Sequence, residues 1–337
     1  MEATADVPAP EFFNNYPLKG TKFDFDRNLI GYGEESLDPK WPNKSRIAVS
    51  FVVNYEEGAE RSLKLGDDIT ESSLFTGLSG SARTYRAFEV ESEYDYGSRA
   101  GVWRIMRLFK KHNMPMTIWA VGHAFQQNQK LVDAMVRDGH EIASHAYRWI
   151  PYSETTPEVE KAYIKKQLAT LKETAGYYPA GWYYGRQSTY SLALLYEAYK
   201  EMNVNLNYVS DAYSDDVPYW MDVPAEKELP AEKRGGMLMV PYSLDCNDYR
   251  FLSPNGFRSS RAFFEHLKNA FDVLYEEGGK MMTVALHCRI MGKPAYYKAL
   301  QDFVEYIATK ENVWVPTRNE IANHFRENFP YSSTKTS

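Results

Sequence analysis

Ile47-Ala48-Val49-Ser50-Phe51-Val52-Val53 is the apolar run that decides the fold, and Asn54-Tyr55-Glu56-Glu57-Gly58 follows it directly. A run dominated by β-branched and aromatic residues is typical of a buried strand in a parallel sheet, and such strands deliver functional side chains at their carboxyl ends. Successive strand residues point to opposite faces, so Glu56 and Glu57 are predicted to differ in role. One would serve as a base while the other holds a metal or a partner. The alternative is an ordinary strand-to-loop junction, because acidic residues are common in loops.

Helix and strand patterns alternate along the chain outward from this run. Further strands are predicted at residues 116–121, 141–145, 180–184, 206–209, 237–240, 281–286 and 313–315. Helices are predicted around residues 102–109, 131–137, 156–171, 191–202, 261–275, 296–308 and before 325. Such alternation predicts an α/β fold of parallel βαβ units. No glycine-rich phosphate loop follows the first strand, so we expect a (β/α) barrel in place of an open nucleotide-binding sheet.

The barrel is expected to form a single domain over residues 46–326. Residues 1–45, rich in Pro, Asn, Asp and Gly, are expected to form an irregular N-terminal arm, and residues 327–337 a C-terminal tail. The polar stretch from 58 to 93 is long for a loop in a compact domain, which indicates a functional or poorly ordered segment. The sequence leaves open whether this segment forms a lid or a subunit contact. It also leaves open whether the protein is a homo-oligomer.

The composition of the chain excludes several classes of protein. The 337 residues carry a net charge of -6, which disfavours a nucleic-acid partner, because phosphate binding relies on clustered Lys and Arg. No run of ~18 apolar residues is present to span a bilayer. The first residues lack the basic and apolar regions of a secretory signal, so we expect a cytoplasmic protein, or a secreted one if a signal was removed. The two cysteines, Cys246 and Cys288, imply no disulfide framework.

Polar side chains recur where the predicted strands end, and in a barrel these ends surround one pocket. The residues are Glu56, Glu57, His145, Arg186, Asp211, Asp215, Asp216, Asp245, Asn247, Asp248 and His287. Together they supply the carboxylates, imidazoles and cation that general acid and base hydrolysis needs. Each has a structural alternative: a neutral histidine bonded to a carbonyl, an arginine paired with a surface carboxylate, or an aspartate that caps a loop.

These residues resemble the motifs of the polysaccharide deacetylase family, also called the NodB-like or family 4 carbohydrate esterases. Asn54 to Gly58 are similar to the paired aspartates before a glycine, Ser144 to Trp149 to the histidine motif, and Leu286-His287 to the last motif. Arg186 and Asp216 fall near the arginine and aspartate motifs. The resemblance covers residues 28 to 326. It is most specific to the branch that contains uric-acid-pathway allantoinases and fungal chitin deacetylase-like proteins.

The resemblance implies a deformed barrel of about seven parallel strands that hydrolyses an amide carbon–nitrogen bond. It implies Glu56 as the base and His287 as the acid, with Arg186 and Asp216 setting their ionisation. Family members usually hold a divalent metal, often zinc, through one aspartate and two histidines four residues apart. Here Glu57 and His145 would be ligands, but Trp149 stands four residues after His145 and cannot ligate a metal. A further ligand, a weakly held metal and catalysis without metal all stay open.

Three functions follow as expectations. The leading one is N-deacetylation of chitin-type N-acetylglucosamine oligomers, with Tyr55, Trp149, Trp182, Tyr184 and Trp220 contacting the sugar. The runner-up is allantoinase-type ring opening of a small cyclic amide, which the missing histidine and the absent signal favour. The third is a sugar-binding protein that has lost catalysis. The expected partner is accordingly a small-molecule or oligosaccharide substrate.

Overall fold

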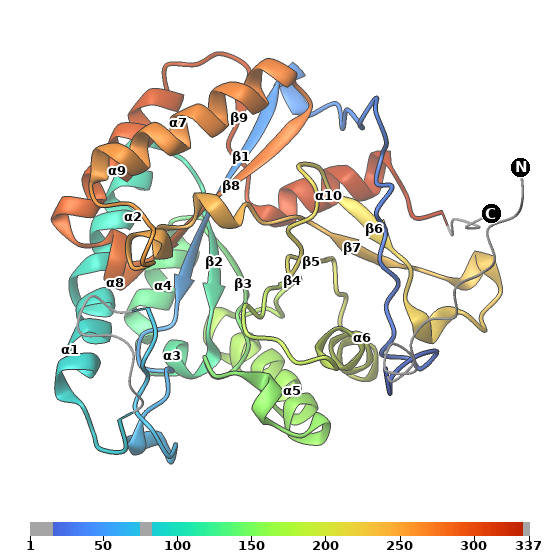
Figure 1. Cartoon of the computed structure of the whole chain (residues 1–337), viewed down its shortest axis with the longest axis horizontal. Helices are drawn as coiled ribbons and strands as arrows, with labels where there is room; N and C mark the ends of the chain where they lie inside the picture. Colours follow the sequence, from blue (N-terminus) through green and yellow to red (C-terminus); the bar gives the residue numbers. More distant parts are fainter. Residues whose placement is uncertain (1–15, 75–82, 333–337) are drawn as a thin grey trace, which may run out of the picture.

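One curled sheet occupies the centre of the protein in a computed structural model that describes residues 16–74 and 83–332 (Figure 1). Its strands are β1 (Ile47–Tyr55), β2 (Thr117–Ala120), β3 (Glu141–Ser144), β4 (Gly181–Trp182), β5 (Tyr208–Val209), β6 (Tyr219–Met221), β7 (Met237–Met239), β8 (Lys280–His287) and β9 (Val313–Trp314). The sheet order is β6-β7-β5-β4-β3-β2-β1-β8, and β9 pairs with the start of β1. Within the described residues, only the β6–β7 pair is antiparallel. The predicted α/β fold class, a deformed single-domain barrel, is confirmed.

The first strand separates two apolar cores because its side chains alternate between the faces of the sheet. Phe51 and Val53 pack into the layer between the sheet and the outer helices. Ala48 and Val52 face the barrel interior, where Trp119 belongs to the same core. This alternation assigns faces to the residues that follow the strand: an even-numbered residue continues the interior side and an odd-numbered one the helix side.

The barrel does not close by strand pairing between β7 and β8. The segment that follows β7 crosses this seam: Ser243 Oγ accepts a hydrogen bond from Thr283 N at 3.1 Å, and Asn247 pairs with Ala285 as an isolated bridge. Inside the seam, the fully buried Arg318 donates to Thr283 Oγ1 on β8 and to the carbonyls of Val240 and Pro241. A loop and one guanidinium therefore replace the missing ladder.

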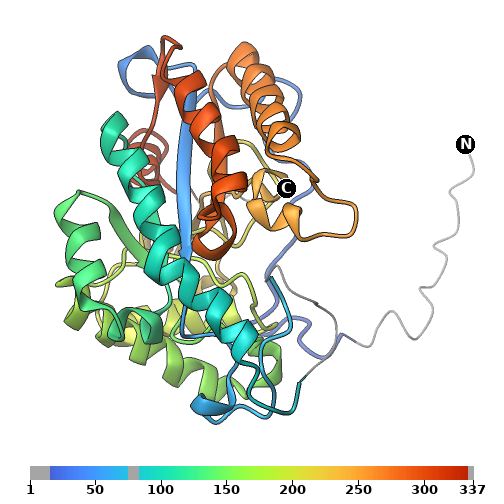
Figure 2. The ribbon, with the colours of Figure 1, turned by 90° about the vertical axis from the view of Figure 1, so that its left-hand side faces the viewer.

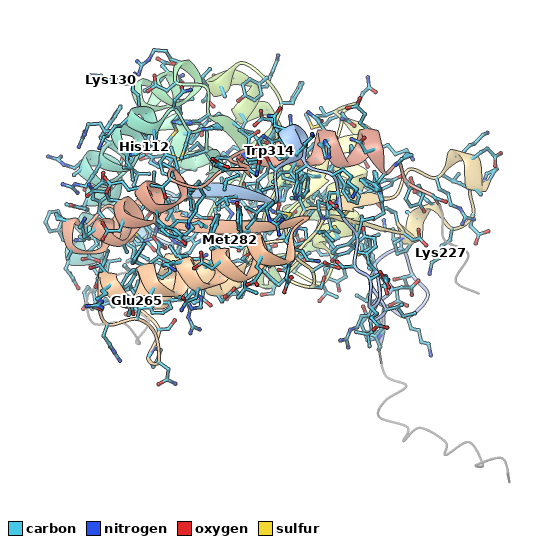
Figure 3. The ribbon with its side chains drawn as sticks, turned by 90° about the horizontal axis from the view of Figure 1, so that it is seen from above. His112, Lys130, Lys227, Glu265, Met282 and Trp314 are labelled. Atoms are coloured by element: carbon cyan, nitrogen blue, oxygen red, sulfur yellow. The ribbon has the colours of Figure 1, made fainter. Side chains whose placement is uncertain are left out.

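Helices cover the outer side of the sheet, except for the last one, whose buried residues Ile321, Ala322 and Phe325 belong to the interior core (Figures 1 and 2). They are α1 (Phe88–Tyr96), α2 (Val102–His112), α3 (Gly122–Gln126), α4 (Gln129–Arg137), α5 (Pro157–Ala175), α6 (Ser191–Glu201), α7 (Ser260–Glu277), α8 (Cys288–Met291), α9 (Pro294–Ile307) and α10 (Arg318–Asn328). A π-helical turn, Gly97–Gly101, joins α1 to α2. Figure 3 shows Met282 of β8 behind α7, whose exposed face carries Glu265, and Met282 is fully buried in the outer core.

Residues 16–45 of the N-terminal arm pack along the barrel without regular strands. Phe23 contacts Tyr190 edge to face, with ring centroids 5.0 Å apart, and Lys22 pairs with Glu197 of α6. Tyr32 Oη donates to Pro218 O before β6, so the arm runs past α6 and β6 (Figure 1). No helix in the described part of the chain has the length and hydropathy that a membrane crossing requires.

The predicted elements match the structure except in the segments with weak patterns. The strands predicted at 180–184 and 206–209 shorten to two residues each, because only Gly181–Trp182 and Tyr208–Val209 keep ladder bonds. Strand β6 and the helices α1, α3 and α8 were not predicted. Helix α1 carries only the two buried residues Val90 and Tyr94, which is too few to produce a helical period in the sequence.

Candidate active site

Three side chains from three strands meet at the carboxyl end of the barrel. Glu56 follows β1, His145 follows β3, and His287 is the last residue of β8, where it pairs in register with Asn54. As an even-numbered residue, Glu56 continues the interior face of β1. Its Oε1 atom lies 3.2 Å from His145 Nε2 and 3.4 Å from His287 Nε2. The predicted base therefore touches both predicted histidines.

Glu56 is held as a carboxylate by the charges around it. The side chain is 1% exposed, and its Oε2 lies 2.8 Å from the Arg289 guanidinium. Burial opposes ionisation, but Arg289 and His287, with a hydrogen bond from His145, lower the pKa of Glu56 well below its ordinary value. A carboxylate that is charged at neutral pH can accept a proton from water.

His287 is held in the opposite state, as an imidazolium. Its Nδ1 lies 2.6 Å from Asp248 Oδ1, and its Nε2 faces Glu56. Burial alone would lower the pKa of His287, but the charges of Glu56 and Asp248 outweigh it and raise the pKa to about 9. A charged base and a protonated acid thus stand side by side at neutral pH, which is an arrangement for general acid and base catalysis.

His145 is fixed on both sides of its ring. Nδ1 lies 2.9 Å from the carbonyl oxygen of Tyr183, and the ring stacks on that of Tyr183 with an interplanar angle of 12°. Tyr183 stacks in turn on Tyr242, at 4.6 Å between centroids. With Nδ1 directed at a carbonyl, Nε2 is directed at Glu56 Oε1, so His145 orients the base.

Glu57 turns away from this cluster. As an odd-numbered residue it points to the helix layer, where a Cβ built on Gly97 would lie 2.3 Å from Glu57 Oε1. Its Oε2 accepts a hydrogen bond from Glu56 N at 3.0 Å. Burial, assisted by the charge of Glu56, raises the pKa of Glu57 to about 7, although Arg289 opposes the shift. The predicted difference between the two glutamates follows from the strand period.

The predicted metal ligands do not form a metal site. The family that the sequence resembles typically uses a divalent metal, and a catalytic zinc needs three protein ligands that converge on one point. Glu57 and His145 lie on different faces of β1's end, and Trp149 is 4% exposed and packs beside a guanidinium. Among the described residues, one group of three metal-type side chains has ligand atoms within 4.8 Å of one another: Asp245, Cys246 and His266. None of those three is a predicted ligand, so the residues around Glu56 do not fit the metal that the resemblance implied.

The prediction for Arg186 is wrong as regards its partner. Its guanidinium pairs with Glu71 at 2.9 Å and lies 3.5 Å above the ring of Trp149, and it does not contact Glu56. Gly185, with φ of 68°, turns the chain outward just before it. Arg289, two residues after His287, makes the ion pair that was expected of Arg186.

The prediction for Asp216 is also wrong. Asp216 is exposed and accepts a hydrogen bond from Met281 N through its backbone carbonyl, at the start of β8. His287 stands six residues further along this strand, a distance of roughly 20 Å at the usual rise per residue. Asp248, which the seam segment brings beside His287, makes the contact that was expected of Asp216.

The predicted aromatic contacts with a sugar are not brought to the site, except near Trp149. Trp182 and Tyr184 are buried in a separate core with Tyr199, on the side of β4 opposite to Tyr183. Trp220 lies at β6, where its Nε1 donates to Phe329 O. These predictions are corrected. Because side chains alternate along a strand, Tyr183 lies against His145, whereas Trp182 and Tyr184 point to the opposite side.

Tyr55 and Trp149, two of the predicted substrate contacts, lie against residues that surround the site. Tyr55 is 1% exposed, and its Oη lies 2.7 Å from Ser98 Oγ. Trp149 covers Arg289, with 5.2 Å from the guanidinium carbon to the ring centroid. Sequence reasoning gave no role to Arg289 and named Asp248 only among the strand-end residues. Arg289 adjoins the last histidine motif, and that adjacency is the signal that could have identified it.

Comparisons with known proteins give a consistent result. The family profile described as polysaccharide deacetylase matches residues 83–205. A protein of Schizosaccharomyces pombe named as a polysaccharide deacetylase is 42% identical over 319 residues, 91% of this chain and 99% of that protein. The crystal structure of a protein of Pseudomonas aeruginosa PAO1, described as a probable polysaccharide deacetylase, is 43% identical, covers 91% of this chain and 100% of its own, and superposes with a TM-score of 0.84. The crystal structure of PuuE allantoinase is 44% identical, covers 92% and 100%, and gives the same TM-score.

Proposed function

Because the chain belongs to the polysaccharide deacetylase family, we propose that it hydrolyses the carbon–nitrogen bond of a small cyclic amide, as an allantoinase does. The observation that carries this proposal is the burial of the base and the acid. Glu56, His145 and His287 are 1%, 2% and 4% exposed, which suits a small ligand enclosed by the site better than a polymer that lies across it.

Two further observations support the small substrate. Three of the five aromatic residues expected to bind a sugar do not lie beside Glu56: Trp182 and Tyr184 are buried in a separate core, and Trp220 donates to Phe329 O at β6. The similarity to PuuE allantoinase extends over 92% of the chain. Allantoin is therefore the substrate that we propose first.

The residues divide the reaction between one base and one acid. Glu56 accepts a proton from a water molecule, whose oxygen forms a bond to the amide carbonyl carbon. As the carbon–nitrogen bond breaks, His287 Nε2–H donates its proton to the departing nitrogen, which stays on the same molecule because the amide is cyclic. The new carboxyl group releases its proton to solvent, and Glu56 returns its proton to His287 across the 3.4 Å that separate them.

A second function keeps a specific observation in its favour. The relatives from S. pombe and P. aeruginosa, 42% and 43% identical, are both described as polysaccharide deacetylases. The same base and acid would cleave the N-acetyl amide of an N-acetylglucosamine oligomer and release acetate.

The test is turnover of allantoin and of tetra-N-acetylchitotetraose side by side, by the wild type and by Glu56→Gln. We expect ring opening of allantoin without acetate release, and a loss of roughly 100-fold to 10,000-fold in the variant. Acetate release from the oligomer, with no opening of allantoin, would reject the cyclic-amide proposal in favour of the second function. Equal turnover by the wild type and Glu56→Gln would remove the base from Glu56 altogether.

A further inference from the structure

Arg289 is a buried cation whose terminal nitrogens have no hydrogen-bond acceptor among the described residues. Its side chain is fully buried, and Nε donates to Leu74 O at 2.7 Å. The two terminal nitrogens make no hydrogen bond, although one of them lies 2.8 Å from Glu56 Oε2. This contact is an ion pair without hydrogen-bond geometry, and the other terminal nitrogen lies 3.7 Å from Glu57 Oε1, so the two carboxylates do not take up all four terminal N–H groups.

Two aromatic rings hold the guanidinium in this position. Its central carbon lies 4.2 Å from the ring centroid of Tyr94 and 5.2 Å from that of Trp149. Cation–π contacts stabilise a desolvated guanidinium. Together with the bond to Leu74 O and the ion pairs with Glu56 and Glu57, they fix the position of the charge.

The charges of the pocket leave a donor role open. Glu56 Oε2 and Glu57 Oε1 are buried and have no hydrogen-bond partner among the described residues, and these two oxygens face the Arg289 guanidinium at 2.8 and 3.7 Å. The amide carbonyl oxygen needs a cationic or hydrogen-bond donor when it becomes an oxyanion, and such donors contribute roughly 100-fold to 1,000-fold to turnover. A divalent metal would supply that charge, but the side chains around Glu56 do not fit one.

We propose that Arg289 is a catalytic residue that binds the amide carbonyl oxygen through its terminal N–H groups and takes the place of a metal. This inference rests on the proposed amide hydrolysis. Trp149 then has a clear purpose at the position where the family resemblance places the second histidine ligand, because it packs on the guanidinium. Relative to the family motif, Trp149 replaces the second histidine ligand. Arg289 then supplies the positive charge that a metal would supply.

The planar fork of a guanidinium makes the proposal specific to arginine. Two parallel N–H groups can share one oxyanion, whereas the ammonium of lysine is a compact point charge on a longer flexible stem. Lysine should therefore restore the charge of the pocket but only part of the rate.

The experiment compares Arg289→Ala, Arg289→Lys and Arg186→Gln in protein treated exhaustively with chelator. Arg186 is the matched control, because its guanidinium also lies on Trp149 and pairs with a buried glutamate, Glu71, but does not contact Glu56. We expect Arg289→Ala to lose roughly 100-fold to 1,000-fold in kcat with a smaller change in KM. Added guanidinium ion should recover part of this loss, and Arg289→Lys should lie between the extremes.

The outcomes separate this inference from the proposed function. If the wild type opens allantoin, and Arg289→Ala either keeps its kcat or loses it without recovery by guanidinium, the inference is rejected while the function stands. Loss of wild-type turnover on chelation, restored by zinc, would also reject it. If the wild type does not open allantoin, the same variants are tested on acetate release from the oligomer. Circular dichroism identifies a variant that has not folded, and Arg289→Lys, which keeps the buried charge paired, provides the result in that case.

Discussion

Asp248 contacts both the backbone and the ring of His287: Oδ2 accepts a hydrogen bond from His287 N at 2.7 Å, and Oδ1 lies 2.6 Å from His287 Nδ1. The two contacts fix the ring relative to its own backbone and leave Nε2 directed at Glu56. Asp248 is fully buried, so its charge acts on the imidazole with little screening. The acid of the proposed reaction therefore depends on a residue that is not part of its strand.

Substitution of Asp248 by Asn should decrease the fraction of His287 that is protonated at a given pH. Loss of this neighbouring charge should lower the pKa of His287, because the charge of Asp248 is one of the causes that raise it. Since His287 must be protonated to act, the alkaline limb of the pH–kcat profile should move to lower pH. Asp245→Asn, on the same segment but paired with His266, is the control. An unchanged alkaline limb in Asp248→Asn would contradict the role given to Asp248.

The stability of the protein should fall on the alkaline side of neutrality through His287. Its pKa is about 9 in the folded protein and about 6.5 when unperturbed, so the folded state binds the proton more tightly. The stabilisation, on the order of 3 kcal/mol, is fully present below about pH 6.5 and is lost as the pH rises through about 9. Urea unfolding at pH 7 and pH 9.5 measures it. A His287→Asn variant that shows the same decrease would assign the effect to another group.

Glu57→Gln should keep most of its turnover, because Glu57 neither touches His145 nor holds a metal. The folded-state pKa of Glu57 is about 7, above its ordinary value, so the wild type loses stability as the pH rises from about 4.5 through 7. The variant lacks this loss, and its free energy of unfolding should exceed that of the wild type by more at pH 8 than at pH 5. A loss of turnover as deep as that of Glu56→Gln would show that Glu57 is needed for the reaction.

Arg318→Met should weaken the fold without touching the site. The guanidinium donates to Ser210 Oγ, to Thr283 Oγ1 and to two carbonyls at the seam. Each acceptor that loses its donor in the interior costs about 1 to 3 kcal/mol, so the free energy of unfolding should decrease by about 3 kcal/mol or more. Arg326→Met, on the same helix but only partly buried, should cost less. Equal losses in the two variants would show that the seam does not depend on Arg318.

The sequence predicted which strands bear the chemistry but not which neighbours reach it. Glu56, His145 and His287 follow apolar runs, and strand ends of a barrel converge, so their meeting could be inferred. The partners of a strand-end residue depend on loop paths, which leave no periodic signal. Arg186 was thus assigned a contact that Arg289 makes, and Asp216 one that Asp248 makes.

The aromatic residues show a different kind of error. Trp182, Tyr183 and Tyr184 are consecutive, and composition alone cannot tell which of them faces the barrel interior. The strand period decides it: Tyr183 stacks on His145, while its two neighbours pack in another core. The same period correctly separated Glu56 from Glu57, because the strand before them is nine residues long and regular.

The gap between β7 and β8 has a chemical consequence as well as an architectural one. A barrel closed by a continuous ladder would have no room there for a chain segment that carries a carboxylate inward. Here Asn247 of the crossing segment pairs with Ala285, and the next residue, Asp248, lies against His287. Any motion that opens this wall would separate the imidazolium from its counter-ion, so proton donation and the integrity of the wall are expected to fail together.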